Sequence, residues 1–590
     1  MHIRTLTPWL LGACALALSA CTPSSTSTEQ TKLSWLNSTP IALKDHWQIA
    51  SSPRQGAWFA YYQGQSSLFL SSPQGVQQAL VDGAQGAAPS GLALALNERG
   101  SATMWRDKVP TKGLYLKQGD TPAKELGVEG FDSEPLARFD LKPDGQGWHV
   151  LWYGEHIDPK TQSRYNIYYR HVDAQNNASA TELLMPGFYP NWLTDEKGNI
   201  AVFSWDNTQS PPKMIMRVRD IASGQFGAIQ TLAKTTANIP PLIRTYRSGS
   251  RWFVLWIDQL GEGANEFLLR GLWSDDQGAH WDNFDFPTIK GFDISDVQIA
   301  HDEASSHAIM AISGTWRFKD PSAKNTFYFT QSQDRGAHWS EPQLMRDKQA
   351  STDSRAEAAQ VFFGEKPGST WLVWEDWREV RGRLYFAYSE DYGVSWRHKN
   401  LPLAAQPEGN NLLAAQKDAG YRDGQGLHLA AENVTNDQGL EKKIFALPLN
   451  SALLEQSLKL AEKASSVGSE QALKDRVTAY WKALANGTYD NSYSHLDPFI
   501  RAAWPITTYK QRLGLIKYRE NINIDSVRIH GHFADVNLRV TAFVPEFEMK
   551  GKKHSAPDRE VPITERWLWI DGNWYREYSE ESSEIKFTRY

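Results

Sequence analysis

The sequence has 590 residues, of which 41% are hydrophobic and 22% are charged, a composition typical of globular rather than disordered proteins. This length exceeds one ordinary core, so two or more domains are expected. The formal net charge of -6 and the pI near 6.2 argue against a nucleic-acid partner, because such a partner requires a basic patch. His-rich and Cys-rich tracts are absent, and we expect no metal and no cofactor.

Residues 1–20 are predicted to be an export signal. A single arginine precedes an apolar run that is too short to span a bilayer, and small residues follow this run. The end of this signal and the residue that follows it read Leu18-Ser19-Ala20-Cys21. This sequence resembles the lipobox of bacterial lipoproteins. The resemblance implies that Cys21 is acylated, and Thr22 after it implies sorting to the outer membrane. The alternative is an ordinary cleaved signal that leaves a free cysteine. Residues 21–31 are predicted to be a flexible tether.

Residues 32–450 repeat a pattern of short strands. Three units begin their main strand at Ala57, Ala308 and Leu427, and five further units have an aromatic strand that ends in an acid. These five acids are Asp107, Glu155, Asp206, Asp258 and Asp376. Eight related units predict a mainly β fold, namely a β-propeller. We expect seven or eight blades, because the spacing between units shortens in the N-terminal half. Residues 32–43 read as an extra strand that pairs with 442–449 and closes the ring.

The phrase Ser-x-Asp-x-Gly-x-x-Trp occurs three times, each time after an alternating aromatic strand. We expect it in a tight turn, where the aspartate accepts backbone N–H bonds, the glycine supplies a positive φ and the tryptophan anchors the turn. The tryptophans are predicted to be buried and all twelve residues to be structural. They are Ser274, Asp276, Gly278, Trp281, Ser332, Asp334, Gly336, Trp339, Ser389, Asp391, Gly393 and Trp396.

The starts of this phrase at 274, 332 and 389 lie 58 and 57 residues apart, and phrase and spacing resemble the Asp-box, or bacterial neuraminidase repeat, of sialidase-superfamily propellers. The resemblance implies that second-strand ends and first-strand starts ring one mouth of the channel, with the Asp-box turns on the opposite face. The alternative is that each acid only bonds its own turn. The candidate ligand-binding residues are Arg106, Asp107, Glu155, Asp206, Asp258, Arg317, Asp353, Arg355, Asp376 and Arg378.

Within this set, we expect Arg355 and Arg378 to approach each other, with Asp353 and Asp376 as partners. Replacing Arg378 with alanine is then expected to weaken ligand binding with little effect on stability.

Residues 451–470 are rich in Ala, Leu, Lys and Glu and predict a helical linker. One face of the next helix carries apolar residues at i, i+3, i+4 and i+7: Val477, Tyr480, Trp481 and Leu484. Strands follow, the last two joined by the hairpin dipeptide Asp571-Gly572. Residues 471–590 therefore resemble nuclear-transport-factor-like and cystatin-like domains, which implies a cone-shaped α+β fold with a concave sheet.

Sialidases bind the sugar carboxylate with three arginines, the first within an Arg-Ile-Pro motif. Here Arg54 is followed by Gln55 and Gly56, so the motif is missing and no catalytic residue is assigned. We expect an envelope-anchored lipoprotein that binds a glycan or an envelope protein at its channel mouth, and contacts the membrane through lipid on Cys21. The alternatives are an exo-acting glycosidase of sialidase type and an assembly factor of an envelope complex; whether the protein is an enzyme stays open.

Overall fold

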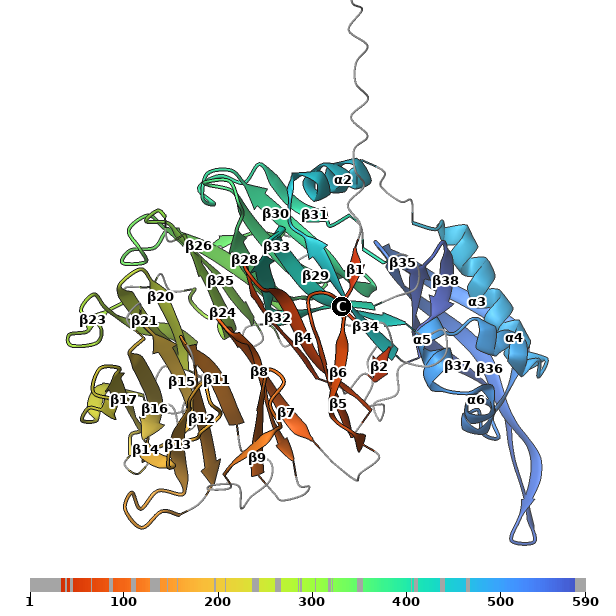
Figure 1. Ribbon diagram of the computed structural model, residues 1–590. Helices are drawn as coiled ribbons and strands as arrows, with labels where there is room; N and C mark the ends of the chain where they lie inside the picture. Colours follow the sequence, from red (N-terminus) through yellow and green to blue (C-terminus); the bar gives the residue numbers. More distant parts are fainter. Residues whose placement is uncertain are drawn as a thin grey trace, which may run out of the picture.

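The computed structural model describes residues 33–578, except for short internal stretches: 38–39, 43–45, 65, 84–88, 108–112, 128–137, 146, 156, 196–197, 207, 209, 236–242, 260–266, 285, 287–288, 303, 317–319, 321, 347–353, 405, 408–411, 436–440 and 463–466. Within these residues, eight antiparallel sheets follow one another from 34 to 448, and a ninth sheet with helices follows them (Figure 1). The predicted export signal, the tether up to 31 and Cys21 lie outside the described residues.

Each of the eight sheets forms one blade. Blade 1 contains β3 (Trp47–Ser52), β4 (Gly56–Gln63), β5 (Ser67–Ser71) and β6 (Gln77–Val81). Blade 2 contains β7 (Ser90–Asn97), β8 (Gly100–Asp107), β9 (Gly113–Gln118) and β10 (Lys124–Gly127). Blade 3 contains β11 (Arg138–Asp144), β12 (Gly147–Glu155), β13 (Tyr165–Val172) and β14 (Glu182–Pro186). Blade 4 contains β15 (Phe188–Thr194), β16 (Ile200–Asp206), β17 (Lys213–Asp220), β18 (Gln225–Phe226) and β19 (Gln230–Lys234).

The second half of the ring repeats this arrangement. Blade 5 contains β20 (Ile243–Ser248), β21 (Arg251–Gln259), β22 (Phe267–Ser274) and β23 (Asp282–Asn283). Blade 6 contains β24 (Asp293–His301), β25 (Ala308–Thr315), β26 (Thr326–Ser332) and β27 (Gln343–Leu344). Blade 7 contains β28 (Ala356–Phe363), β29 (Thr370–Glu379), β30 (Arg381–Ser389) and β31 (His398–Pro402). Blade 8 contains β32 (Leu412–Asp423), β33 (Gly426–Thr435) and β34 (Glu441–Pro448), with β1 (Ser34–Trp35) and β2 (Ile41–Ala42).

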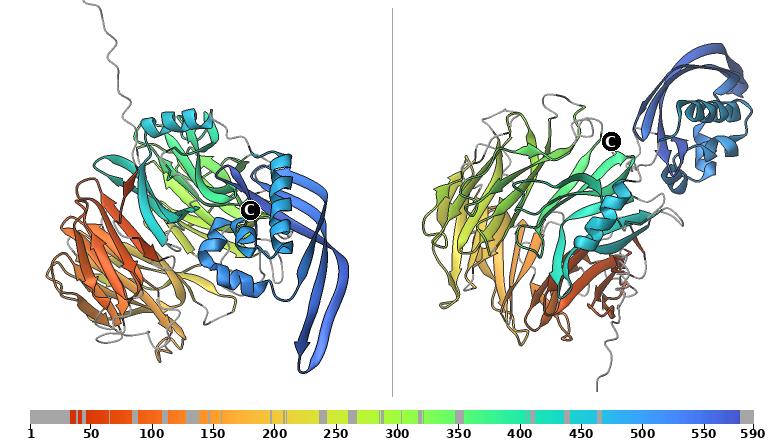
Figure 2. Two further views of the ribbon diagram at one scale, coloured as in Figure 1. Left: turned by 90° about the vertical axis from the view of Figure 1, so that its right-hand side faces the viewer. Right: turned by 90° about the horizontal axis from the view of Figure 1, so that it is seen from above.

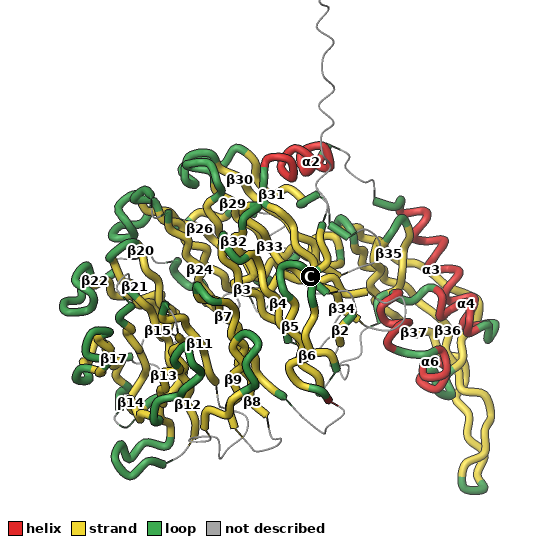
Figure 3. The backbone as a smooth tube through the Cα atoms, viewed as in Figure 1, coloured by secondary structure: helices red, strands yellow, loops and turns green. Residues whose placement is uncertain are grey.

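The N-terminal strands close the ring. Ser34 pairs with Ala446, and Ile41 pairs with Lys442, so β1 and β2 both pair with β34 of the last blade. The first strand of blade 8 also packs beside the first strand of blade 1. These pairings confirm the predicted closing strand, and the molecule is an eight-bladed β-propeller, the upper of the two predicted blade numbers (Figures 1 and 3).

Blades pack face to face through alternate residues of their central strands. In β12, Trp148, Val150 and Trp152 lie in the core shared with blade 2. Leu151 and Tyr153, which point the other way, lie in the core shared with blade 4. Because both faces of the strand are buried, it reads as a continuous apolar run rather than an alternating one. The polar residue in this run, His149, is therefore also fully buried.

A helical region and a curved sheet follow the propeller. The helices are α2 (Ser451–Ala461), α3 (Glu470–Ala485), α4 (Tyr489–Ser494), α5 (Pro498–Ala503) and α6 (Ile506–Arg512). The sheet contains β35 (Lys517–His530), β36 (Phe533–Met549), β37 (Lys552–Ile570) and β38 (Asn573–Arg576), in that order. Figure 2 shows the sheet curving around α3, with the β36–β37 hairpin extending away from the helices. This is a small α+β domain.

The predicted helical linker differs from the structure. Only 451–461 form α2, and this helix packs on the propeller, because Leu453 lies in a core cluster with residues of blades 7 and 8. Ser457 also accepts a hydrogen bond from the backbone N of Ala404 at 2.8 Å. The apolar stripe of α3 is buried as its spacing predicts, and Ser469 caps the helix by accepting from the N of Ala472.

The α+β domain docks on the turn between β29 and β30 of blade 7. Arg381 and Asp497 form an ion pair between the two domains, and each side chain is only 2% exposed. The guanidinium carbon of Arg381 lies 4.5 Å from the centre of the Phe499 ring. Next to it, Val380 packs in an apolar cluster with Phe533 and other residues of the curved sheet.

Among the described residues, no helix has the length and apolarity that a membrane span requires.

Candidate functional site

The five acids and the three Ser-x-Asp turns lie at opposite ends of the blades. The acids stand at or near the ends of the second strands β8, β12, β16, β21 and β29. The turns follow the third strands β22, β26 and β30. Neighbouring strands are antiparallel, so the end of a second strand and the end of a third strand point to different faces. We call these the acid face and the turn face.

Four of the five acids bind groups of the propeller itself. Asp206 accepts bonds from the N and Oγ1 of Thr208 at 2.9 and 2.7 Å, which is an Asx turn. Glu155 forms an ion pair with Arg164 of the following loop. Asp258 is 2% exposed, accepts from Thr235 Oγ1 at 2.5 Å and pairs with the Nε of Arg270 at 3.1 Å. The last of the four, Asp376, is described next.

Asp376 is fully buried at the centre of a polar network in blade 7. Its carboxylate accepts from Arg346 Nε at 3.0 Å, Trp374 Nε1 at 2.9 Å and Arg378 Nη2 at 2.7 Å. Burial would raise the pKa of Asp376, but the hydrogen bonds and charges of Arg378 and Arg346 outweigh burial and lower the pKa. This carboxylate is saturated by protein donors, which is a structural role.

Arg106 and Asp107 are buried at the end of β8, with 8% and 3% exposure. Burial, and then the charge of Asp107, raises the pKa of the neighbouring Tyr62. Exposure this low leaves little of either side chain for a ligand. Arg317 and Asp353 lie outside the described residues.

Arg355 and Arg378 lie at the same end of blade 7, since the N of Trp377 donates to the backbone O of Arg355 at 3.0 Å. Of the two predicted partners, Asp376 pairs with one of these arginines, and Asp353 lies outside the described residues. Arg378 binds Asp376, whereas Arg355 Nη1 lies 3.3 Å from Glu357 Oε1. The guanidinium of Arg378 lies 4.3 Å from the centre of the Tyr385 ring. Arg378 is thus part of the buried network, and Arg355 is not.

Arg355 belongs to a group of cations that come from three parts of the molecule. Its side chain is 35% exposed, yet its Nε is buried and has no hydrogen-bond partner among the described residues. Lys324 is close by, because the N of Ala356 donates to the O of Asn325 at 2.8 Å. Burial lowers the pKa of Lys324, and the charges of Arg566, from β37, and of Arg355 lower it further. We call Lys324, Arg355 and Arg566 the junction cations.

Sequence reasoning missed two of the junction cations. Lys324 stands in a loop of blade 6, and Arg566 stands in the curved sheet, so only the docking of the two domains brings them together. No motif in the sequence signals that docking. Two carboxylates accompany them: Asp535 pairs with Arg566 at 2.7 Å, and Glu357 accepts from Asn325 Nδ2 at 3.0 Å.

Tyrosine can act as a nucleophile when a base activates it, and blade 7 contains a tyrosine in contact with a glutamate. Tyr385 donates a hydrogen bond to Glu379, and Arg378 lies over its ring. Tyr385 is only 5% exposed, however, and burial together with Glu379 raises its pKa well above the ordinary value. A nucleophile must be accessible to the substrate and must be activated. The Tyr385 hydroxyl is buried and has a raised pKa, so it meets neither condition.

The three Ser-x-Asp turns share one hydrogen-bond pattern. The serine Oγ donates to the aspartate Oδ1 at 2.8, 2.8 and 2.7 Å, and accepts from the glycine N at 2.8, 2.8 and 2.9 Å. The three glycines have φ values of 89°, 84° and 81°, a region that favours glycine. The predicted burial of all three tryptophans is wrong in part. Trp396 is 9% exposed, but Trp281 and Trp339 are only half-buried against the blade edge.

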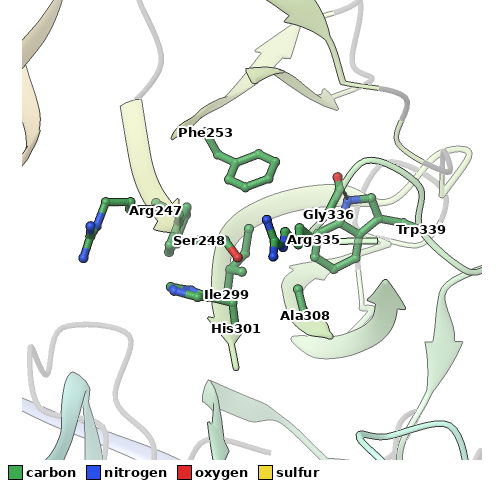
Figure 4. Close-up of a pocket in the computed structure, with 10 residues that line it drawn as sticks. Arg247, Ser248, Phe253, Ile299, His301, Ala308, Arg335, Gly336 and Trp339 are labelled. Atoms are coloured by element: carbon green, nitrogen blue, oxygen red, sulfur yellow. Dashed lines mark hydrogen bonds between the residues drawn. The ribbon is translucent and has the colours of Figure 1, made fainter. Parts of the chain in front are cut away.

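A small hollow, open to solvent, lies between blades 5 and 6 on the turn face. Figure 4 shows Phe253, Trp339 and Ala308 around it, with Arg335 beside the indole ring. The walls come from the β20–β21 turn, the β24–β25 turn and the second Ser-x-Asp turn. The lining is mainly apolar, and none of the predicted ligand-binding residues contributes to it.

No known protein family and no curated protein matches this sequence. Solved structures that resemble it include the polysaccharide lyase Uly1, with 10% identity, coverage of 67% of this chain and 88% of that chain, and a TM-score of 0.38. The α-L-arabinanase of Penicillium chrysogenum complexed with arabinobiose also has 10% identity, with coverage of 54% and 93% and a TM-score of 0.33. The endo-arabinase of Bacteroides thetaiotaomicron has 12% identity, coverage of 44% and 93%, and a TM-score of 0.26. At TM-scores this low the likenesses carry no argument, so the propeller assignment depends on the strand pairing alone.

Proposed function

We propose that the protein is a binding propeller, which recognises an anionic group of a glycan or of an envelope protein at the junction cations on the acid face. The single observation behind this proposal is the half-exposed Arg355, whose Nε is buried without a hydrogen-bond partner among the described residues. A buried donor left unpaired is costly, about 1–3 kcal/mol, and a ligand oxygen at this position would remove that cost. Arginine is suited to this role, because its planar fork matches a carboxylate or a sulfate.

Charge supports the same ligand chemistry. The pKa of Lys324 is lowered by burial and by Arg566 and Arg355, so three cations from different parts of the molecule repel one another at this place. An anion bound between them would relieve this repulsion. Neighbouring Glu357 and Asp535 already balance part of the charge, which favours a weakly anionic ligand such as a uronic or sialic acid residue over a polyphosphate.

The sialidase-superfamily assignment remains part of the proposal. It is supported by the shared hydrogen bonds of the three turns, which suit an Asp-box. The α3 helix against a curved four-stranded sheet supports a nuclear-transport-factor-like domain. Hydrolysis is the weaker alternative, because the acids at this face bind protein groups and the Tyr385–Glu379 pair is buried.

We also propose that lipid on Cys21 anchors the chain in the bacterial envelope, at the outer membrane. This rests on the lipobox resemblance of Leu18 to Cys21 and on the predicted tether that follows. Replacing Cys21 with serine should move the protein from the detergent phase to the aqueous phase in a partitioning assay. A protein that stays aqueous in both forms would show that Cys21 carries no lipid.

The binding proposal is tested with the form that lacks residues 1–30, which keeps every described strand. The soluble protein is incubated with carboxylated and neutral oligosaccharides, and with chromogenic glycosides that include a sialoside. Arg355→Ala should weaken binding of the carboxylated ligands about 30-fold, or about 2 kcal/mol. The matched control is Arg397→Ala, which removes an exposed arginine with a 2.9 Å ion pair to Glu390. Equal losses in both variants, or release of the chromophore from the sialoside, would refute the binding proposal.

A further inference from the structure

Three side chains with metal-binding atoms converge on the turn face of blade 3. Asp144 ends β11, His149 lies near the start of β12, and His171 lies near the end of β13. His149 and His171 are direct partners across the two strands. The Oδ2 of Asp144 lies 2.5 Å from His171 Nε2 and 3.8 Å from His149 Nε2, and the three ligand atoms all lie within 4.8 Å of one another.

A second observation points to a ligand at this cluster. His149 is fully buried, and its Nε2 has no hydrogen-bond partner among the described residues. Its other ring nitrogen, Nδ1, lies 2.7 Å from the hydroxyl oxygen of Tyr169. When Nδ1 donates to Tyr169, the lone pair of Nε2 faces Asp144 and is available for coordination. A fully buried imidazole nitrogen without a partner is costly unless something binds it.

We propose that Asp144, His149 and His171 bind one divalent transition-metal ion, and that Zn²⁺ fits them best. Two imidazole nitrogens and one carboxylate oxygen are ligands that zinc accepts, at about 2.0 to 2.2 Å. Around a tetrahedral ion such ligand atoms stand about 3.3 Å apart. The His171–Asp144 pair would therefore open by less than 1 Å, and His149 would approach Asp144 by about 0.5 Å.

The surroundings determine the fourth position and the strength of the site. The side chains of Asp144 and His171 are 17% and 28% exposed, so the fourth position faces solvent and would hold water. Asp144 Oδ1 accepts from the N of Gly147 at 2.8 Å, which orients the carboxylate and leaves Oδ2 for the metal. Arg219 of blade 4 opposes the metal, because its guanidinium carbon lies 5.6 Å from the centre of the ring of Tyr169, the hydrogen-bond partner of His149, and brings a positive charge near the site.

Two other His–Asp pairs on the turn face provide matched controls. His280 Nδ1 lies 2.5 Å from Asp276, and His338 Nδ1 lies 2.5 Å from Asp334, the same distance as in the His171–Asp144 pair. Among the described residues, neither control pair belongs to a group of three metal-binding side chains. A pair alone should not hold zinc with comparable affinity.

The experiment uses the full chain, purified in detergent without a histidine tag and treated with a chelator. Zn²⁺ is titrated by calorimetry, and Co²⁺ is added separately to record its visible d–d absorption. We expect one equivalent of Zn²⁺ per chain and tetrahedral Co²⁺ bands. His171→Asn and Asp144→Asn should each weaken Zn²⁺ more than about 100-fold, whereas His280→Asn should leave it unchanged. Arg219→Met should tighten binding.

Both ligand variants, His171→Asn and Asp144→Asn, change partly exposed side chains, so their metal-free melting temperatures should match that of the parent chain. The proposal is overturned if the parent chain binds Zn²⁺ no more tightly than His171→Asn does. It is also overturned if His280→Asn loses as much Zn²⁺ affinity as His171→Asn. A third contrary result is Zn²⁺ affinity that Asp144→Asn and His171→Asn both retain. Any of these outcomes would mean that Asp144 and His171 form an ion pair only.

Discussion

The buried ion pair between Arg381 and Asp497 should hold the α+β domain on the propeller. Both side chains are 2% exposed, and Asp497 also accepts from the N of Phe499 at 2.9 Å. Replacing Arg381 with methionine removes the cation but keeps an apolar chain against Phe499, which leaves the carboxylate buried without its ion-pair partner. Breaking a buried pair from one side costs about 3–5 kcal/mol, whereas an exposed pair contributes about 0–1 kcal/mol.

Chemical denaturation of the form lacking residues 1–30 measures this cost, with tryptophan fluorescence and circular dichroism recorded together. The chain has two domains, so we expect Arg381→Met to lower the transition of the α+β domain and to separate it from that of the propeller. Arg397→Ala, which breaks the exposed pair with Glu390, should leave both transitions unchanged. Coincident transitions at the parent midpoint in Arg381→Met would refute the view that this pair couples the domains.

Three further changes test the remaining structural assignments. Trp396→Ala should lower stability by about 3–5 kcal/mol, and Trp281→Ala by less, because Trp396 is buried and Trp281 only half-buried; equal losses would contradict this order. The backbone N and ring of His280 lower the pKa of Asp276 to about 2, below the ordinary 3.8. Ionised Asp276 therefore stabilises the fold above pH 3.8. Acid melting curves should show this contribution to stability lost as pH falls towards 2, and the Asp276→Asn variant should lack this pH-dependent loss. Arg378→Ala should destabilise the fold by about 1–3 kcal/mol, since it deprives buried Asp376 of a donor, and unchanged thermal melting would contradict its role in the network.

The sequence predicted the propeller because its signals are local and repeated. A spacing of 57 to 58 residues, and strands that end in acids, place each residue in a blade without knowledge of any other blade. The closing strand could be predicted as well, since residues 32–43 have no blade of their own and the ring would otherwise leave an edge.

The candidate site was less predictable, because it depends on which polar groups satisfy one another. Asp376 has the same sequence signature as Asp206, yet one is buried among arginines and the other only bonds Thr208. Arg566 reaches the acid face only through domain docking, for which the sequence has no signal. The His149–His171 pair, in contrast, could be found from the sequence by aligning the two strands of blade 3 across their turn.

The central claim, that the junction cations bind an anionic group, is tested most directly by titrating the soluble protein with paired oligosaccharides that differ only in one carboxylate. We predict that the carboxylated member binds and the neutral member does not, and that Arg355→Ala removes the difference while Arg397→Ala keeps it. Equal binding of both members, or a preference for the carboxylate that survives in Arg355→Ala, would contradict the proposed function.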